Sequence, residues 1–233
     1  MRIRIKFRKY DVMRFIGHLD IMRYFQKSMR RAGIDIAYSA GFSPHQIMSF
    51  AAPLGVGLCS DGEYLDIEAN SITTAQDMKN QLNDVMVPGI DIVSLRLLPD
   101  QAGNAMASVA AAKYLIEWKD SNHIPESLPE KAAEFMSNKS IIITKQTKKN
   151  TLQLDIRPFI YSMEANDSSI TLFVNASSSD NVKPVILLDA FYKSFGSVLD
   201  PLQIQITRID TYYNQGTAEM PVFAPLEAAG DEF

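Results

Sequence analysis

Four cations stand at every second position near the start of the chain: Arg2, Arg4, Lys6 and Arg8. Apolar residues fill the positions between them. This period of two predicts a strand over residues 2–8, with one apolar face toward a core and one basic face. A row of such cations can neutralise phosphates, so we expect all four to contact RNA. The alternative is that they are solvated or pair with Asp66 and Glu68 of a neighbouring strand.

A second row of cations lies on a predicted helix over residues 18–32. Its members occupy adjacent positions of one helix face: Arg23, Lys27, Arg30 and Arg31. No acidic residue follows Asp20 on that face, and an apolar stripe covers another face, as in a helix packed on a core. Gly33 is placed to end the helix. We expect these cations to extend the RNA-binding surface, whereas the simpler alternative is a solvated helix face.

Two histidines could carry acid–base chemistry. His18 begins the predicted helix, where the helix dipole disfavours the imidazolium form, so it could serve as a general base in RNA cleavage or only cap the helix. His45 ends a loop that begins at Tyr38 and is rich in hydroxyl groups. We expect five residues to form one pocket rimmed by arginines: His18, Asp20, Tyr38, Ser43 and His45. The alternative is that Tyr38 packs in the core and His45 caps a strand.

Charge is unevenly distributed along the chain. The first 50 residues hold ten of the 23 Lys and Arg residues but only three of the 27 Asp and Glu residues, in a chain of net charge -4. This segregation favours a negatively charged partner, RNA first and an acidic protein as the alternative. The single cysteine, Cys59, excludes a Cys-ligated iron–sulfur cluster, and we expect no cofactor and no metal. No apolar run approaches the ~20 residues of a membrane span, so we expect a cytoplasmic protein without a membrane partner.

The predicted elements follow the order β-α-β-β-α-β twice, with an additional strand in the second set. This is the split βαβ order, so we expect the α+β class and two tandem ferredoxin-like domains. A turn over residues 145–150 joins two strands of the second set. The predicted ranges are 1–99 for a basic domain, 100–112 for a linker, 113–216 for the second domain and 217–233 for a mobile tail.

Several motifs in the first 70 residues together resemble a known family. In chain order they are Phe15-Ile16-Gly17-His18-Leu19-Asp20, Arg30-Arg31-Ala32-Gly33, Gly41-Phe42-Ser43-Pro44-His45 and Ser60-Asp61-Gly62-Glu63-Tyr64. They look like the radical SAM-linked protein family, uncharacterised bacterial proteins encoded beside, or fused to, a radical SAM enzyme. The resemblance implies that a radical SAM protein is the partner, that this partner holds the iron–sulfur cluster, and that the present chain is its substrate-binding companion. We therefore expect a non-catalytic RNA-binding companion that acts in tRNA or rRNA modification.

Two other functions remain open. Tandem ferredoxin-like domains with a histidine near the first helix are similar to the endoribonucleases that process CRISPR repeats, and in that case His18 and His45 would be catalytic without a metal. The glycine-rich loop that those enzymes carry near the C-terminus is not evident in this sequence. The third possibility is a protein-interaction module whose basic surface binds an acidic protein.

Overall fold

The computed structural model describes residues 1–146 and 151–233, so the turn predicted over residues 145–150 lies mostly outside the described residues. The protein is a mixed α+β structure, as predicted. It divides into two compact units, one made of Met1–Ala110 with Arg208–Phe233 and the other of Ala111–Thr207. The strand β10 (Ile204–Asn214) gives its first four residues to the second unit and the rest to the first.

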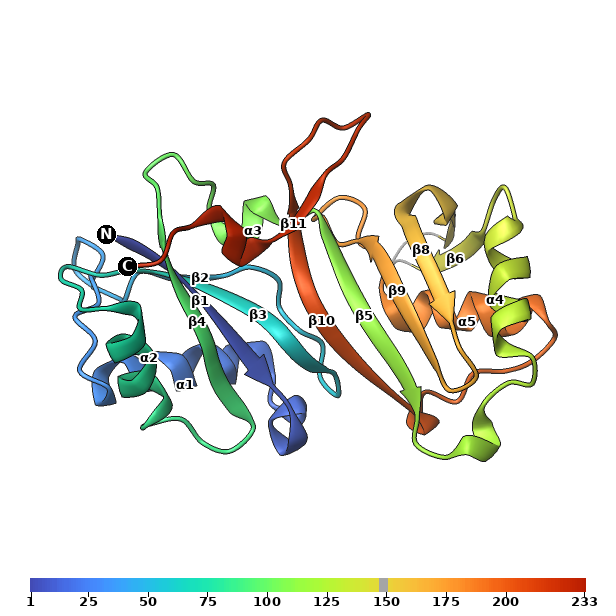
Figure 1. The fold of residues 1–233 in the computed structure, drawn as a ribbon, viewed down its shortest axis with the longest axis horizontal. Helices are drawn as coiled ribbons and strands as arrows, with labels where there is room; N and C mark the ends of the chain where they lie inside the picture. The colour runs from blue at the N-terminus through green and yellow to red at the C-terminus, as the bar shows by residue number, and fades with distance from the viewer. Residues whose placement is uncertain (147–150) are drawn as a thin grey trace. The chain divides into compact units, whose positions relative to one another are not determined.

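The first unit begins with the element order that the sequence predicts. The elements are β1 (Arg2–Lys9), α1 (His18–Arg31), β2 (Met48–Phe50), β3 (Cys59–Glu68), α2 (Ala75–Asn83) and β4 (Ile90–Leu98). Short 3-10 and α-helical turns add η1 (Asp11–Phe15) and α3 (Ala105–Ser108). The strands follow the order β4-β1-β3-β10, and β2 pairs with β3. Strand β1 is therefore central, between β3 and β4 (Figure 1).

One face of β1 carries the core of this unit. Ile3, Ile5 and Phe7 are almost completely buried, as the period of two predicts. They belong to a cluster with the apolar stripe of α1 and with Met78 and Leu82 of α2, so both helices cover this face of the strands. The helix α1 ends one residue earlier than predicted, and Gly33 follows it with a φ of +68°, the left-handed conformation that glycine adopts at low cost.

The C-terminal segment covers the opposite face of β1. Strand β11 (Phe223–Pro225) pairs with β10, and the 3-10 turn η5 (Leu226–Ala229) contacts β1 and β4. Leu226 is fully buried, and Asp231 forms a β-bridge with Leu97. The segment predicted to be a mobile tail makes these contacts in the structure (red in Figure 1). Leu226 and Phe233, which packs against the core cluster, anchor the segment, and its apolar residues lack a period that would predict a strand or a helix.

The second unit has its own sheet and helices. Strands β5 (Ala111–Trp118), β9 (Ser169–Asn175) and β8 (Ile160–Ala165) lie in that order, and the helices are α4 (Leu128–Ser137) and α5 (Pro184–Ser194). Phe135 of α4 packs edge-on against Phe191 of α5. Strands β6 (Ile142–Gln146) and β7 (Thr151–Asp155) form a separate two-stranded sheet, and short 3-10 turns complete the unit as η2 (Ser121–His123), η3 (Arg157–Phe159) and η4 (Pro201–Gln203).

The ranges of the units differ from the predicted domain ranges at both ends. The first unit continues through residues 100–110, which were predicted to be a linker. It also includes the C-terminal residues from Arg208 onward. The reason is that β3 needs a neighbour on its second edge, and β10 supplies it. Gly62 of β3 permits this close approach, because a Cβ atom there would lie 2.7 Å from the Cα of Asp210.

Candidate functional site

The cations predicted on the basic face of β1 are mostly bound internally, and Arg4 is the clearest case. Its side chain is 1% exposed and forms two parallel hydrogen bonds with Asp66, Nε to Oδ1 at 2.7 Å and Nη2 to Oδ2 at 2.8 Å. Asp66 stands directly opposite Arg4 in the β1–β3 register. Arg4 Nη1 also donates to the carbonyl oxygen of Leu226 at 2.9 Å. Every nitrogen of the guanidinium therefore donates to the protein, and none faces solvent.

Lys6 is the next cation on this face, and two carboxylates hold it. Its Nζ atom donates to Asp210 Oδ2 at 2.8 Å and to Glu227 Oε1 at 2.7 Å. Burial alone would lower the pKa of Lys6, but these two hydrogen bonds and the charges behind them leave it raised. The phenol of Tyr64 donates to the other oxygen of Asp210 at 2.6 Å, and burial with the Asp210 charge raises the pKa of Tyr64. Lys6 is thus part of a closed network between β1, β10 and η5.

The two outer cations of β1 are also bound within the protein. Arg2 donates to the carbonyl oxygen of Ala102 at 2.7 Å. Arg8 is 45% exposed and pairs with Asp61 at 2.7 Å, a bond that raises its pKa. The basic face of β1 therefore binds this chain's own carboxylates and carbonyls. The pairing with Asp66, considered as an alternative from the sequence, is present.

The cations of α1 have a different environment. Arg23, Lys27, Arg30 and Arg31 are all exposed. Arg23 forms an exposed ion pair with Asp20 of the first turn at 3.3 Å, and Arg31 donates to the carbonyl oxygen of Val85. In the described part of the chain, Lys27 and Arg30 have no carboxylate within ion-pair distance. This row is the basic surface of the first 50 residues that remains open to a partner.

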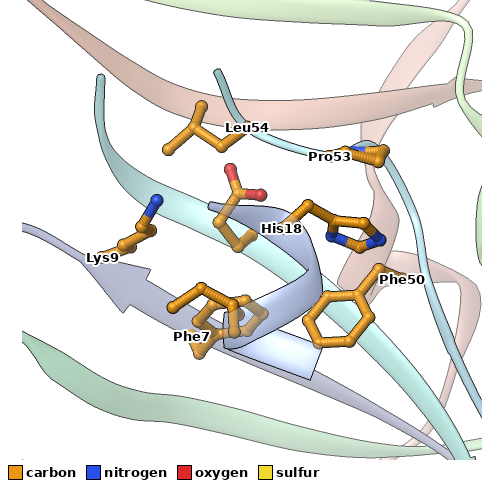
Figure 2. A pocket seen from close by; sticks show the side chains of 8 residues that line it. Phe7, Lys9, His18, Phe50, Pro53 and Leu54 are labelled. Carbon is orange, nitrogen blue, oxygen red and sulfur yellow. The ribbon is translucent and has the colours of Figure 1, made fainter. Parts of the chain in front are cut away.

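His18 lines a small cavity with two buried charged residues. The cavity has a volume of about 10 Å³, room for roughly one water molecule. Its walls come from β1, α1, β2 with the residues after it, and β3: Phe7, Lys9, His18, Ile21, Phe50, Pro53, Leu54 and Glu63. Figure 2 shows the imidazole ring beside Phe50 and Pro53. The rings of His18 and Phe50 pack edge to face, with their centroids 5.2 Å apart. Lys9 approaches the same space from β1.

The charged groups of this cavity have shifted pKa values. Lys9 is 3% exposed, and burial lowers its pKa although its Nζ donates to the carbonyl oxygen of Ile16 at 2.7 Å. Burial raises the pKa of Glu63 despite the opposing charge of Arg208, whose Nη1 donates to Glu63 Oε1 at 3.0 Å. Burial, followed by the Lys9 charge, lowers the pKa of His18. His18 is therefore neutral near pH 7 and able to accept a proton.

Chemically, the His18 cavity combines a base with a buried ammonium group that could stabilise negative charge. Its volume limits it, because a space for one water molecule holds no nucleotide. His18 is itself partly exposed, so a substrate could approach it only from outside this cavity. Among the residues that the structure describes, no group of three or more His, Cys, Asp or Glu side chains is arranged to hold a metal ion.

The residues predicted to share one pocket lie in several places. His18 lines the small cavity, whereas Tyr38 and His45 line a second hollow with Arg30. Asp20 pairs with Arg23 on the exposed helix surface, and Ser43 is exposed at the loop. His45 is bonded to Ser39, through Nδ1 to Oγ at 2.9 Å and through its backbone N–H at 3.1 Å. Arg30 is the arginine that the prediction and the second hollow have in common.

Sequence reasoning missed Lys9, Glu63 and Gln46. For Lys9 a signal was present, because it continues the series of Ile3, Ile5 and Phe7 and so places a charge on the buried face of the strand. A charge in an apolar phase marks a position that needs a special partner. Glu63 and Gln46 carry no comparable sign, since both stand in segments of mixed composition.

No helix within the described ranges has the length and apolar character that a membrane span requires. A search of curated proteins found no match. A family model described as "Uncharacterized protein conserved in bacteria (DUF2344)" matches residues 2–184, which include most of both units. The chain therefore belongs to the DUF2344 family.

Proposed function

We propose that this protein is a non-catalytic RNA-binding companion of a radical SAM enzyme and that RNA binds along α1. The observation that carries the proposal is the exposed row of four cations on α1. Their spacing of four, three and one residues places them along one edge of the helix, so that successive phosphates of a strand can reach them. Neighbouring loop residues add the stacking groups that single-stranded RNA needs, since Tyr38 is half exposed and Phe42 is fully exposed.

The proposal gives α1 the role that the sequence divided between β1 and α1. Arg4 and Lys6 would have to break short ion pairs before they could bind phosphate, and the phosphate would have to displace the C-terminal segment. On α1, Lys27 and Arg30 need only release solvent and counterions, and Arg23 gives up one exposed ion pair with Asp20. The free-energy cost of binding phosphate is therefore lower on α1 than on β1.

The proposal includes two ferredoxin-like domains and a radical SAM partner. The order β4-β1-β3 with β2 beside β3 supports a ferredoxin-like first domain, and β5-β9-β8 with two helices supports a second one that carries the β6–β7 insertion. The motifs around His18 and Gly62 support the radical SAM partner by resemblance. Because this chain has one cysteine, that partner would supply the iron–sulfur cluster.

The test is binding of a fluorescently labelled single-stranded RNA, measured by anisotropy at low salt. The variant combines Arg23→Gln, Lys27→Gln and Arg30→Gln. A control with the same loss of charge combines Lys139→Gln, Lys183→Gln and Lys193→Gln, three exposed lysines of the second unit. We expect the α1 variant to lose at least tenfold in affinity, since each phosphate contact is replaced by a neutral group, and the control to stay within about twofold. Equal losses in both variants would contradict a site on α1.

The rival function is RNA cleavage at His18, and the position of its imidazole in one cavity with Lys9 is the observation that favours it. It predicts products with 2′,3′-cyclic phosphate ends that disappear in His18→Ala. We expect no cleavage by the wild-type protein, because the cavity at His18 is too small for a nucleotide. Reproducible cleavage that depends on His18 would replace the proposal.

A further inference from the structure

A second hollow in the first unit lies between α1 and the loop that follows it. It has a volume of about 220 Å³ and is lined by Gln26, Arg30, Tyr38, Pro44, His45 and Gln46. It is thus many times larger than the cavity at His18. Arg30 places it beside the row of cations proposed to bind RNA.

Gln46 gives this hollow an unsatisfied acceptor. The residue is 5% exposed, and its Oε1 atom has no hydrogen-bond partner among the described residues. Its Nε2 atom donates to the hydroxyl of Tyr38 across 3.4 Å, a long and weak bond. A buried carbonyl without a donor costs about 1–3 kcal/mol, so native structures seldom retain one without a reason. A ligand that brings a donor into the hollow would supply that reason.

The other residues that line this hollow can bind the base and the phosphate of a nucleotide. The Tyr38 ring is 51% exposed and offers a face on which a base can stack. Arg30 uses Nε for a 3.4 Å bond to Gln26, and in the described ranges its terminal nitrogens make no hydrogen bond. They can therefore bind a phosphate. His45 also lines the hollow, and Ser39 holds its ring through Nδ1.

We propose that this hollow, the Gln46 pocket, binds one unstacked base of the RNA and selects a base with an exocyclic amine. This rests on the proposed RNA-binding function and adds the part that reads the base. The base stacks on Tyr38 and donates its amine to Gln46 Oε1, and because that atom is buried the amide must turn toward the base on binding. Uracil fits less well, because it has no exocyclic donor and its ring N–H is recessed between two carbonyl oxygens that would face the buried acceptor.

The test compares short oligouridylates that carry one central adenosine, N6,N6-dimethyladenosine or uridine, measured by anisotropy. One hydrogen bond to a buried acceptor corresponds to about fivefold in affinity, so we expect adenosine to bind about fivefold tighter than either of the others. Gln46→Met should abolish this difference while keeping the side-chain volume. Gln76→Met, on the exposed surface of α2, should preserve it.

A second variant keeps the test decisive if Gln46→Met does not fold. Tyr38→Ala removes an exposed ring and should weaken binding of all three oligonucleotides severalfold. Equal affinity of the wild-type protein for the three, or a preference that survives in Gln46→Met, would overturn the Gln46 pocket. Binding that is blind to the base but still depends on α1 would leave the proposed function standing, whereas no binding of any oligonucleotide at low salt would overturn both.

Discussion

The rows of cations on β1 and on α1 look alike in sequence but differ in their partners. Each has four Lys or Arg residues within the first 31 positions. On β1 the carboxylate partners of Arg4 and Lys6 are Asp66, Asp210 and Glu227, which lie 62, 204 and 221 residues away along the chain. On α1 the one carboxylate partner is Asp20, three residues from Arg23 in the described structure. Local density of charge therefore does not reveal whether a cation faces solvent or a distant carboxylate.

The difference follows from the position of each element. A central strand has two faces, and when both are covered its polar face must find partners inside the protein. A helix that packs one stripe on a sheet leaves its opposite face in water. The covering of β1 depends on the C-terminal segment, which returns from the far end of the sequence.

The largest effect should come from breaking the buried pair of β1. Arg4→Ala leaves Asp66 buried and without its partner, and we expect it to lower the free energy of unfolding by about 3–5 kcal/mol. Arg30→Ala, on the exposed helix surface, should change it by about 0.5 kcal/mol or less. Urea denaturation followed by circular dichroism measures both.

A double variant separates the charge from the packing at this position. Arg4→Met with Asp66→Leu removes both charges, and we expect it to recover much of the stability that Arg4→Ala loses. If Arg4→Ala cost no more than Arg30→Ala, the contrast between the two rows would be wrong.

A slightly smaller effect should follow from loosening the C-terminal cover. Leu226 is fully buried, so Leu226→Ala should lower the free energy of unfolding by about 2–4 kcal/mol. Phe42→Ala removes a larger but fully exposed side chain and should cost about 0.5 kcal/mol or less. Thermal unfolding compares the two. A mobile C-terminal segment would instead make Leu226→Ala as mild as Phe42→Ala.

A smaller effect concerns pH and the cavity at His18. The pKa of His18 is lower in the folded protein than in the unfolded chain. When the pH falls below about 6.5, His18 therefore becomes protonated in the unfolded chain while it is still neutral in the folded protein. The stability associated with neutral His18 is therefore complete above that pH and is lost as the pH falls through the lower, folded-state pKa. His18→Gln should lack this dependence. Urea titrations of both proteins between about pH 5 and pH 8 would show it, and parallel curves would contradict it.

The sequence predicts the local part of this fold well. The alternation in β1 and the helix α1 with Gly33 after it both appear in the structure, because each depends on periodicity within one segment. The role of β10 as a neighbour of β3 and the ordering of the C-terminal segment could not be predicted, since they depend on contacts across most of the chain.

The site follows the same division. Exposure of the cations on α1 is a local property and could be expected from the pattern of the helix. The separation of His18 from Tyr38 and His45 is a matter of loop geometry, and the burial of Gln46 depends on how α1 and the following loop pack. Lys9 is the exception, because the alternation of β1 is enough to predict that it lies on the apolar face of the strand.

The most direct test of the contrast between the two rows is the salt dependence of RNA binding. Each phosphate contact to single-stranded RNA contributes about 0.7 to the slope of log K against log salt concentration. We expect the variant with Arg23→Gln, Lys27→Gln and Arg30→Gln to have a slope shallower by about 2, and Arg8→Gln, on the paired strand, to keep the wild-type slope. An unchanged slope in the α1 variant, together with a shallower one in Arg8→Gln, would show that RNA binds the strand and would contradict the account.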